Sequence, residues 1–334
     1  MHSTFAIVGR ITREFILPAT GQPLLDNPGG NALYAAGGLM VWEKEIGLLA
    51  RIGEDYPRTW LKDLEARGMD IQGVCILPQS IDLRSFIAYD EKFSVTRSNP
   101  VLQFARRELP FPKSLLGYQS PPEIQKDAKK PDLLAPLPVE IPRDYLETSA
   151  VHLCPLDFMS HNQLAHVFKA SSVNTITLDP SPGYMSPSFY KELRVILSGL
   201  TAFLPSEEEL RALFWGETND LWEMAAALGD YGCEIIVVKR GVRGQMVYDV
   251  KGKHKWEVPA YSSRMADLTG VGDSFCGGFL AGYKKDYDPL QAALYGNVSA
   301  SLKIEGSGAF YPLDVLPGLA EARLNVLKDL VRKV

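Results

Sequence analysis

The chain has 334 residues, of which 46% are hydrophobic and 22% are charged, and its formal net charge is −5. These proportions indicate a folded globular protein and exclude a disordered, collagen-like or coiled-coil chain. Because acidic residues outnumber basic ones, we do not expect a broad basic surface that binds nucleic acid, and we expect the partner to be a small molecule.

The cysteines and the apolar pattern bear on the cellular compartment. Four cysteines, at positions 75, 154, 233 and 276, are far apart and include no Cys-x-x-Cys pair, which predicts neither a disulfide framework nor a zinc knuckle and favours a reducing compartment. The first residues lack a basic stretch followed by a long apolar run, and no run of about 18 apolar residues occurs. We therefore expect a cytoplasmic protein that does not bind membranes.

Short apolar runs rich in β-branched residues recur along the chain, and most are separated by segments of helical length and period. The predicted strands are Phe5–Val8, Val151–Cys154, Thr175–Leu178, Thr201–Leu204 and Glu234–Val238. This alternation indicates an α/β fold with a mostly parallel sheet, and runs that are apolar on both faces require helices on both sides of it. Ligands of such sheets bind beyond the carboxyl ends of the strands.

A first glycine cluster lies between Asn27 and Gly38, where the pairs Gly29-Gly30 and Gly37-Gly38 frame small residues. The pattern is typical of a turn that opens a helix and lets the backbone approach a ligand. Close packing between helices explains the same residues equally well. This cluster alone therefore does not decide between the two readings.

Three further segments lie outside the alternation of strands and helices. Residues 82–89 alternate loosely, which predicts a half-exposed antiparallel strand in a small separate sheet. Between Asn99 and Pro142 there are nine prolines in 44 residues, which predicts a long surface excursion with no regular helix or strand through most of its length. The tail from Leu319 to Val334 has apolar residues at helical spacing and predicts an amphipathic helix that packs on the body.

A second glycine cluster, at 267–282, is the strongest indication of chemistry. Gly270 and Gly272 flank Val271 and lead into a helix of small apolar residues, so the backbone N–H groups at its start are expected to bind an anion. Asp273 lies at this helix start, where the helix dipole favours the ionised carboxylate, and it is our candidate for the base that takes a proton from an attacking hydroxyl. In isolation, the same pattern also fits an aspartate that only caps the helix.

Together the two glycine clusters resemble the paired signatures of the ribokinase-like, or PfkB, family of carbohydrate and nucleoside kinases. Further segments match that family in order and spacing: Ile7–Glu14, Ile52–Asp55, Leu178–Pro182, Leu204–Glu209 and Val238–Gly244. The resemblance implies one three-layer α/β sandwich over residues 1–334, with a mostly parallel central sheet and a small β lid formed by about 11–20 and 80–93. Only about 96–142, the proline-rich excursion, has no counterpart.

The resemblance also implies an activity, which is the ATP-dependent phosphorylation of a hydroxyl on a small sugar-like substrate. In this reading Asp273 is the general base, and the amides of Gly270, Val271 and Gly272 bind the migrating phosphoryl group. The residues implied to contact the acceptor are Thr12, Glu14, Gly29, Gly30 and Asn31. Those implied to contact the nucleotide are Ser206, Lys239, Gly241, Gly244 and Asn297. Glu209 is implied to organise Mg²⁺ through water, and Asp267 to help hold a monovalent cation, K⁺.

Several residues depart from the family pattern and leave alternatives open. Ser206 replaces an asparagine near the metal, Glu14 replaces an aspartate, and Tyr34 replaces a second asparagine. The acceptor therefore stays open between a sugar and a nucleoside, since Tyr34 and Phe86 either stack on a base or simply pack. A pseudokinase that binds without turnover is a further alternative, and Lys239 is alternatively a solvated residue at a strand end.

Other chemistries find no support in the sequence. It contains no G-x-x-x-x-G-K-[ST] phosphate loop, no G-x-S-x-G elbow and no H-E-x-x-H motif, which argues against a Walker-type ATPase, an α/β-hydrolase and a zinc protease. Since lids in the resembling family sometimes pair between subunits, a homodimer is one assembly to expect.

Overall fold

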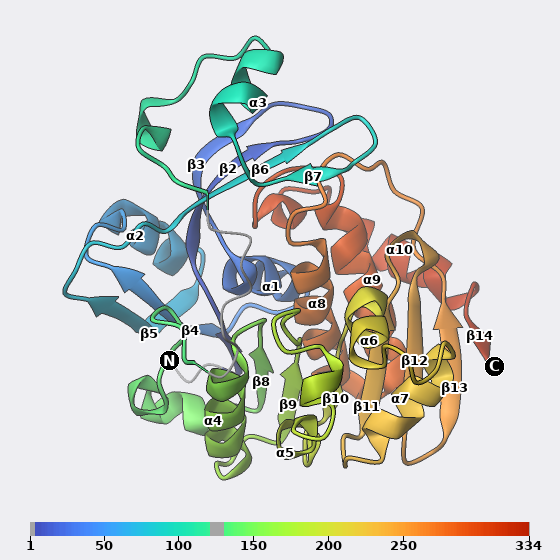
Figure 1. Cartoon of the computed structure of the whole chain (residues 1–334). Helices are drawn as coiled ribbons and strands as arrows, with labels where there is room; N and C mark the ends of the chain where they lie inside the picture. The colour runs from blue at the N-terminus through green and yellow to red at the C-terminus, as the bar shows by residue number, and fades with distance from the viewer. Residues whose placement is uncertain (1–3, 121–129, 334) are drawn as a thin grey trace.

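A large, mostly parallel sheet forms the centre of the molecule (Figure 1). The computed structural model describes residues 4–120 and 130–333. Within these residues the sheet has ten strands, in the order β14 (Arg332–Lys333), β13 (His254–Val258), β12 (Gln245–Asp249), β11 (Ile235–Lys239), β10 (Ala202–Phe203), β9 (Thr175–Leu178), β8 (Ala150–Leu153), β1 (Phe5–Val8), β4 (Ile46–Gly53) and β5 (Met69–Leu77). The strands from β11 to β5 pair in parallel, and β12, β13 and β14 extend the sheet antiparallel.

The side chains of the inner strands pack on both faces of this sheet. On β1, Phe5 and Ile7 join one buried apolar cluster, and Ala6 and Val8 join another on the opposite face. Because successive side chains of a strand point to opposite faces, a run that is apolar throughout requires a cover on each side. All five strands predicted from apolar runs are present, and their ends differ from the prediction by at most one residue.

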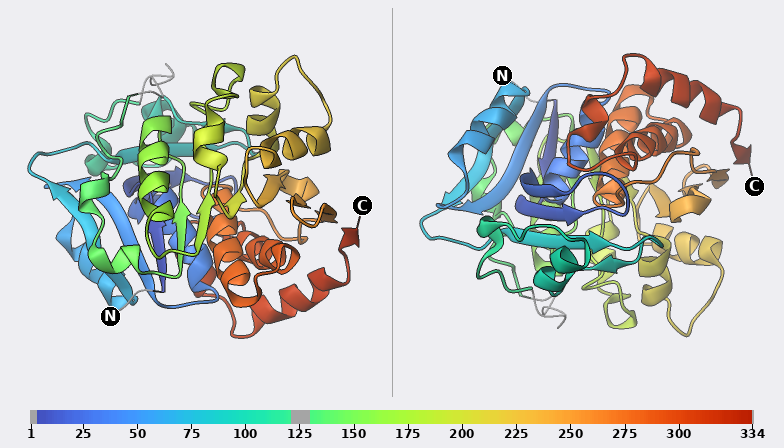
Figure 2. Two further views of the ribbon diagram at one scale, coloured as in Figure 1. Left: turned by 90° about the horizontal axis from the view of Figure 1, so that it is seen from below. Right: turned by 90° about the horizontal axis from the view of Figure 1, so that it is seen from above.

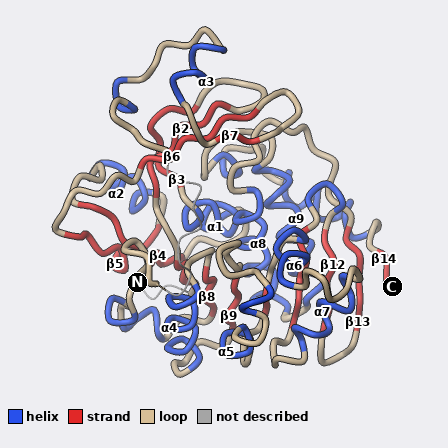
Figure 3. The backbone as a smooth tube through the Cα atoms, in the orientation of Figure 1, coloured by secondary structure: helices blue, strands red, loops and turns tan. Residues whose placement is uncertain are grey.

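Two layers of helices provide these covers (Figure 3). One layer contains α4 (Phe158–Lys169), α5 (Leu193–Leu197), α6 (Glu207–Leu213) and α7 (Leu221–Gly229). The other contains α1 (Asn31–Met40), α2 (Arg58–Ala66), α8 (Val271–Asp286), α9 (Pro289–Lys303) and α10 (Leu319–Lys328). The predicted three-layer α/β sandwich is therefore confirmed.

A smaller sheet, which we call the lid, stands at the carboxyl end of β1 (Figures 1 and 2). Its described strands lie in the order β3 (Leu24–Gly29), β2 (Thr12–Leu17), β6 (Arg84–Tyr89) and β7 (Val95–Thr96). Only residues 9–11 separate β1 from β2, which places the lid over the strand ends where ligands of α/β sheets bind. Seen from above, the lid strands lie across the middle of the molecule (Figure 2).

Strand β6 is buried on both faces from Phe86 to Tyr89, so the prediction of a half-exposed strand at 82–89 is wrong, whereas the small separate sheet predicted for it is present. On the outer face Phe86 packs against Phe104, with ring centroids 6.1 Å apart. On the inner face Ile87 belongs to a cluster that contacts Leu268, within the second glycine cluster. The prediction assumed that one face of the strand met water, whereas the segment that follows β7 in the chain covers it.

That segment belongs to the proline-rich excursion, and we call its residues 99–118 the lid cover. It contains a short helix, α3 (Pro100–Arg106), but most of the described excursion forms neither helix nor strand, as the prolines predict. Asn99 caps α3 by accepting a hydrogen bond from the Leu102 N–H, and Pro100 suits the first helical turn because it needs no N–H partner there. Short 3₁₀ turns follow at Lys113–Leu115, Pro138–Glu140 and Arg143–Leu146. Residues 121–129 of the excursion lie outside the described residues.

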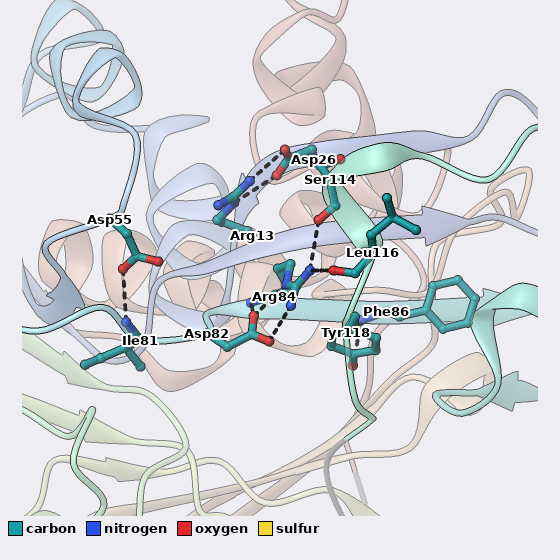
Figure 4. Close-up of polar contacts among 10 residues, drawn as sticks. All are labelled: Arg13, Asp26, Asp55, Ile81, Asp82, Arg84, Phe86, Ser114, Leu116 and Tyr118. Atoms are coloured by element: carbon teal, nitrogen blue, oxygen red, sulfur yellow. Dashed lines mark hydrogen bonds and ion pairs between the residues drawn. The ribbon is translucent and has the colours of Figure 1, made fainter.

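One arginine fastens the lid cover to the lid (Figure 4). Arg84 on β6 donates hydrogen bonds from Nη1 to the carbonyl oxygens of Ser114 and Leu116, at 3.0 and 2.9 Å. The Phe86 N–H donates to Tyr118 Oη at 3.3 Å. The lid and its cover therefore form one packed unit.

The C-terminal helix α10 is shorter than predicted. It ends at Lys328, and the chain then continues into β14, where Arg332 pairs with Glu257 of β13. Val334, the last residue of the predicted helix, lies outside the described residues. Among the helices that the structure describes, none combines the length and the apolar character needed to cross a membrane.

Candidate active site

The turn before α8 has the backbone shape expected of its glycines. Gly270 has a φ of 70°, in the left-handed region that glycine adopts most readily. The Val271 N–H donates a weak hydrogen bond to Leu268 O at 3.3 Å. Gly272 is exposed, and the first amides of a helix have no partner within it. Gly272 is thus the best placed of the three predicted amides to bind an anion.

A cavity of about 980 Å³ opens in front of this turn, at the carboxyl ends of β8 to β11. The predicted site residues that line it are Ser206, Glu209, Lys239, Gly241, Val271, Gly272, Asp273 and Asn297. The predicted site residues outside its lining are Thr12, Glu14, Gly29, Gly30, Asn31, Gly244, Asp267 and Gly270. The structure thus gathers most of the predicted nucleotide and catalytic residues around one cavity, whereas the predicted acceptor residues do not line it.

Asp273 lies in the first turn of α8 and faces this cavity. Burial raises the pKa of Asp273 to about 7, the Asp179 carboxylate adds to the effect, and Lys239 acts against it. The expectation that the helix dipole keeps this carboxylate ionised therefore underestimated burial. A pKa near neutrality suits a general base, which must both take up and release a proton.

Lys239, at the end of β11, is not a solvated residue. Its Nζ donates a hydrogen bond to Asp179 Oδ2 and lies 3.6 Å from Cys276 Sγ. Burial lowers the pKa of Lys239, but the Asp179 carboxylate and its acidic neighbours outweigh burial and raise the pKa overall. A Cβ atom built on Gly272 would lie 3.7 Å from this Nζ, so a charged ammonium stands beside the anion-binding turn.

Ser206 and Glu209 form a capping box at the start of α6. Glu209 Oε2 accepts hydrogen bonds from the Ser206 N–H and Oγ, both at 2.8 Å, and the Glu209 N–H donates to Ser206 Oγ at 3.2 Å. This reciprocal arrangement explains a serine at this position, because its short hydroxyl reaches both partners. Burial raises the pKa of Glu209 to about 7, and the nearby Asp179 carboxylate adds to it.

The carboxylates of the cavity bear on the predicted magnesium. Among the described residues, no three His, Cys, Asp or Glu side chains are grouped so as to hold a metal ion. Asp179 and Glu209 both line the cavity. Mg²⁺ in kinases is usually bound by one or two carboxylates together with phosphate oxygens and water. The donor set therefore fits a magnesium ion that arrives with a nucleotide.

Glu14 is buried beneath the first glycine cluster. Its Oε1 accepts a hydrogen bond from the Gly30 N–H at 2.9 Å, and its Oε2 accepts one from Tyr34 Oη at 2.6 Å. A Cβ atom on Gly29 would overlap the Glu14 carboxylate, so this glycine makes room for a side chain. Tyr34 is itself buried, and Phe86 lies on the outer lid face, so both aromatic rings pack within the protein.

Asn31 is likewise engaged with the backbone. Its Oδ1 accepts a hydrogen bond from the Arg10 N–H at 2.7 Å, and its Nδ2 donates to Pro155 O at 2.8 Å. Thr12 Oγ1 reaches Glu14 Oε1 only at 3.4 Å. The predicted acceptor residues therefore lie together between β1, the lid and α1, where their polar atoms mostly bind one another and the backbone.

Asn297 shapes the wall of the cavity. Its Nδ2 donates to Gln245 Oε1 and to Pro259 O, both at 2.8 Å, and its Oδ1 accepts from the Tyr261 N–H at 3.0 Å. The bonds to Pro259 and Tyr261 hold the loop that follows β13, and the bond to Gln245 reaches the start of β12. Asn297 therefore lines the cavity, as the resemblance implies, and its side chain also stabilises the wall of the cavity.

Asp267 lies behind the turn and is fully buried. Its Oδ1 accepts a hydrogen bond from the Thr269 N–H at 2.8 Å, and its Oδ2 lies 3.7 Å from Lys303 Nζ. Burial lowers the pKa of Lys303, and the Asp267 carboxylate acts in the opposite direction. The residue implied to hold a monovalent cation therefore faces a side-chain cation of this chain.

Two features of the site were not predicted. Asp179 belongs to the matched segment Leu178–Pro182 but had no predicted role of its own, and it lines the cavity and binds Lys239. Tyr89 of the lid forms a 3.0 Å hydrogen bond with Thr269 of the turn before α8. No local pattern connects Tyr89 and Thr269, because they are 180 positions apart.

Comparison with known proteins identifies the family. The model described as pfkB family carbohydrate kinase matches residues 132–316, which is more than half of the chain. The chain therefore belongs to the PfkB family of carbohydrate kinases, and the predicted membership is confirmed. It is accordingly a kinase that transfers a phosphoryl group to a hydroxyl of a carbohydrate or nucleoside.

Individual relatives agree with this assignment. The chain is similar to a cytidine kinase of Thermococcus kodakarensis, with 28% identity over 282 residues, covering 84% of this chain and 88% of the relative. It is 34% identical over 145 residues to a nucleoside kinase of Methanocaldococcus jannaschii, covering 42% of this chain and 44% of that relative. A crystal structure of a putative ribokinase II from E. coli shares the fold, with a TM-score of 0.73 at 18% identity, covering 97% of this chain and 99% of that one.

Proposed function

We propose that this kinase uses ATP to phosphorylate a sugar hydroxyl, with Asp273 as general base. The preferred acceptor is the sugar hydroxyl of a nucleoside. One observation carries the proposal. Asp273 faces the cavity with a pKa raised to about 7, beside the exposed Gly272 amide and the charged Lys239 ammonium. A base, an anion-binding amide and a fixed cation are the elements that phosphoryl transfer requires.

The chemistry follows from these three groups. As the acceptor oxygen attacks the terminal phosphorus of ATP, its proton passes to the Asp273 carboxylate, and the bond to the leaving ADP oxygen breaks. Negative charge spreads over the phosphoryl oxygens during transfer. The Gly272 amide and the Lys239 ammonium stabilise that charge from fixed positions, which costs no reorganisation at the moment of reaction.

Asp179 and Glu209 would hold Mg²⁺ together with the phosphates, and the ion would neutralise charge on the nucleotide. Asp179 also binds Lys239, so the same carboxylate orients the ammonium toward the turn. Ser206 keeps Glu209 in place through the capping box.

The acceptor class is supported by the relative that covers most of the chain, which is named a cytidine kinase. Free sugars are the second candidate acceptor, because the description of the matching family model names carbohydrate kinases. Neither Tyr34 nor Phe86 supports stacking on a base, since both rings pack inside the protein.

The test is a coupled assay of ADP release over a panel of nucleosides and sugars. The Asp273→Asn substitution is expected to lower kcat by about 10² to 10⁴ fold, because it removes the base and keeps the shape. Asp286→Asn, an exposed aspartate at the other end of α8, is the matched control and is expected to leave kcat unchanged.

Two outcomes would contradict the proposal. ADP release that does not depend on Asp273 would exclude it as the base. Binding of panel compounds without any ADP release by the unmodified protein would indicate a pseudokinase. Release with free sugars but not with nucleosides would replace the preferred acceptor and leave the mechanism standing.

A further inference from the structure

A buried ammonium group lies behind the turn before α8, the Gly270–Gly272 segment that we call the catalytic turn. Lys303 is the last residue of α9, and its side chain has no exposed surface. Its Nζ donates a hydrogen bond to Gly306 O at 2.7 Å and lies 5.4 Å from the centre of the Tyr34 ring. Lysine is almost never fully buried unless its charge has a partner. The buried Lys303 ammonium therefore requires a group of opposite charge beside it.

The partner is Asp267, whose two oxygens have different tasks. Oδ1 accepts a hydrogen bond from the Thr269 N–H and so shapes the chain that leads into Gly270. Oδ2 is buried without a hydrogen-bond partner among the described residues, and Lys303 Nζ faces it at 3.7 Å. The ammonium thus balances the carboxylate that sets the start of the turn.

Backbone contacts join the same two segments. The N–H groups of Ala266 and Asp267 both donate to Ile304 O, at 2.8 and 3.2 Å. The residues before α8 and the residues after α9 therefore form one joint. Lys303 supplies the charge at that joint, and the carbonyl of Ile304 supplies its hydrogen bonds.

A monovalent cation at Asp267 does not fit this arrangement. Such an ion would need the free carboxylate oxygen and nearby carbonyl oxygens as ligands. Lys303 Nζ already faces Oδ2 and binds Gly306 O. Placing a second cation beside the ammonium would add repulsion between like charges in a buried site.

We propose that Lys303 is a positioning residue for phosphoryl transfer, whose ammonium supplies the positive charge behind the catalytic turn so that no monovalent cation is required. The proposal rests on the proposed function where activity is the readout. Lys303 does not line the cavity, so it acts through Asp267 and the turn before α8.

The first experiment uses the unmodified protein. Its kcat and its melting temperature are measured with K⁺, with Na⁺ and with choline at constant ionic strength. Both quantities are expected to be the same in all three salts. Activation of several fold by K⁺, or a rise in melting temperature specific to K⁺, would overturn the proposal.

The second experiment removes the ammonium. Lys303→Ala leaves a buried carboxylate without its partner, so kcat is expected to fall by about 10² fold as the turn shifts, with a smaller effect on the KM for ATP. Because the deleted side chain leaves space beside Asp267, K⁺ or NH₄⁺ but not choline is expected to restore part of the activity and to raise the melting temperature. Lys328→Ala, an exposed lysine at the end of α10, is the matched control.

Further arms keep the outcomes separate. If Lys303→Ala does not fold, the Lys303→Met, Asp267→Asn double variant removes both charges and is expected to be more stable than Lys303→Met alone. Equal loss of activity in every salt would assign Lys303 a purely structural role and overturn the proposal. If the unmodified protein phosphorylates no acceptor, the proposed function fails, and the melting temperatures still decide whether a cation binds at Asp267.

Discussion

Three of the acidic residues that line the cavity in front of α8, Asp179, Glu209 and Asp273, influence one another's charge. Burial raises the pKa values of Asp273 and Glu209 to about 7, and in both cases the Asp179 carboxylate contributes. Lys239 binds Asp179 and opposes the shifts at the other two groups. Because interacting groups titrate together, their protonation follows apparent pKa values that belong to the set.

The pH dependence of catalysis follows from this arrangement. The base must be ionised to accept a proton, so kcat/KM is expected to rise with pH through about 7 and to level off above it. Below that range it should fall about tenfold for each pH unit. A pH profile with the preferred acceptor measures this. The range to measure is roughly pH 5 to pH 8, from about two pH units below the pKa of Asp273 to about one unit above it. A value of kcat/KM that stays constant over this range would be inconsistent with Asp273 as an obligatory base.

The lid, its cover and the turn before α8 show how elements from different parts of the chain stabilise the site. The outer lid face holds Phe15 and Phe86, and α3 brings Phe104 against it. The inner face is joined to the catalytic turn by the bond between Tyr89 and Thr269. Packing on the outside of the lid therefore supports the position of its inner face next to the turn.

Removing the central ring of the lid cover tests this element. Phe104→Ala is expected to destabilise the protein by about 3 to 5 kcal/mol, because it deletes a buried aromatic ring between α3 and the lid. Urea unfolding measures the change. Val101→Ala, on the same helix but 62% exposed, is the control and should shift stability by less than about 0.5 kcal/mol. Equal effects of the two substitutions would show that the cover contributes no packing to the lid.

At the scale of the whole molecule, the site forms where both helix layers and the lid meet the carboxyl edge of the large sheet. Ser206, Lys239 and Asp273 reach the cavity from a loop, a strand end and a helix start. The chain also covers the outer face of its own lid. Phe15 and Phe86 on that face are therefore buried by the chain itself.

This self-covering predicts the state of assembly. We expect the protein to have the mass of a single chain in size-exclusion chromatography with light scattering, since residues 99–118 of the same chain already bury Phe15 and Phe86 on the outer lid face. The measurement is made over a range of concentrations. A stable mass of two chains would contradict the prediction and point to the homodimer that the sequence left open.

The sequence by itself determined the strands of the parallel sheet, the two glycine turns and the place of Asp273 at a helix start. These features depend on residues close together in the chain, so periodicity and glycine spacing are sufficient to predict them. Only the tertiary structure decided that Asp179 binds Lys239, that Lys303 faces Asp267, and that residues 99–118 cover the lid. Burial and charge pairing arise from segments far apart in sequence, and no local pattern records which of them will meet.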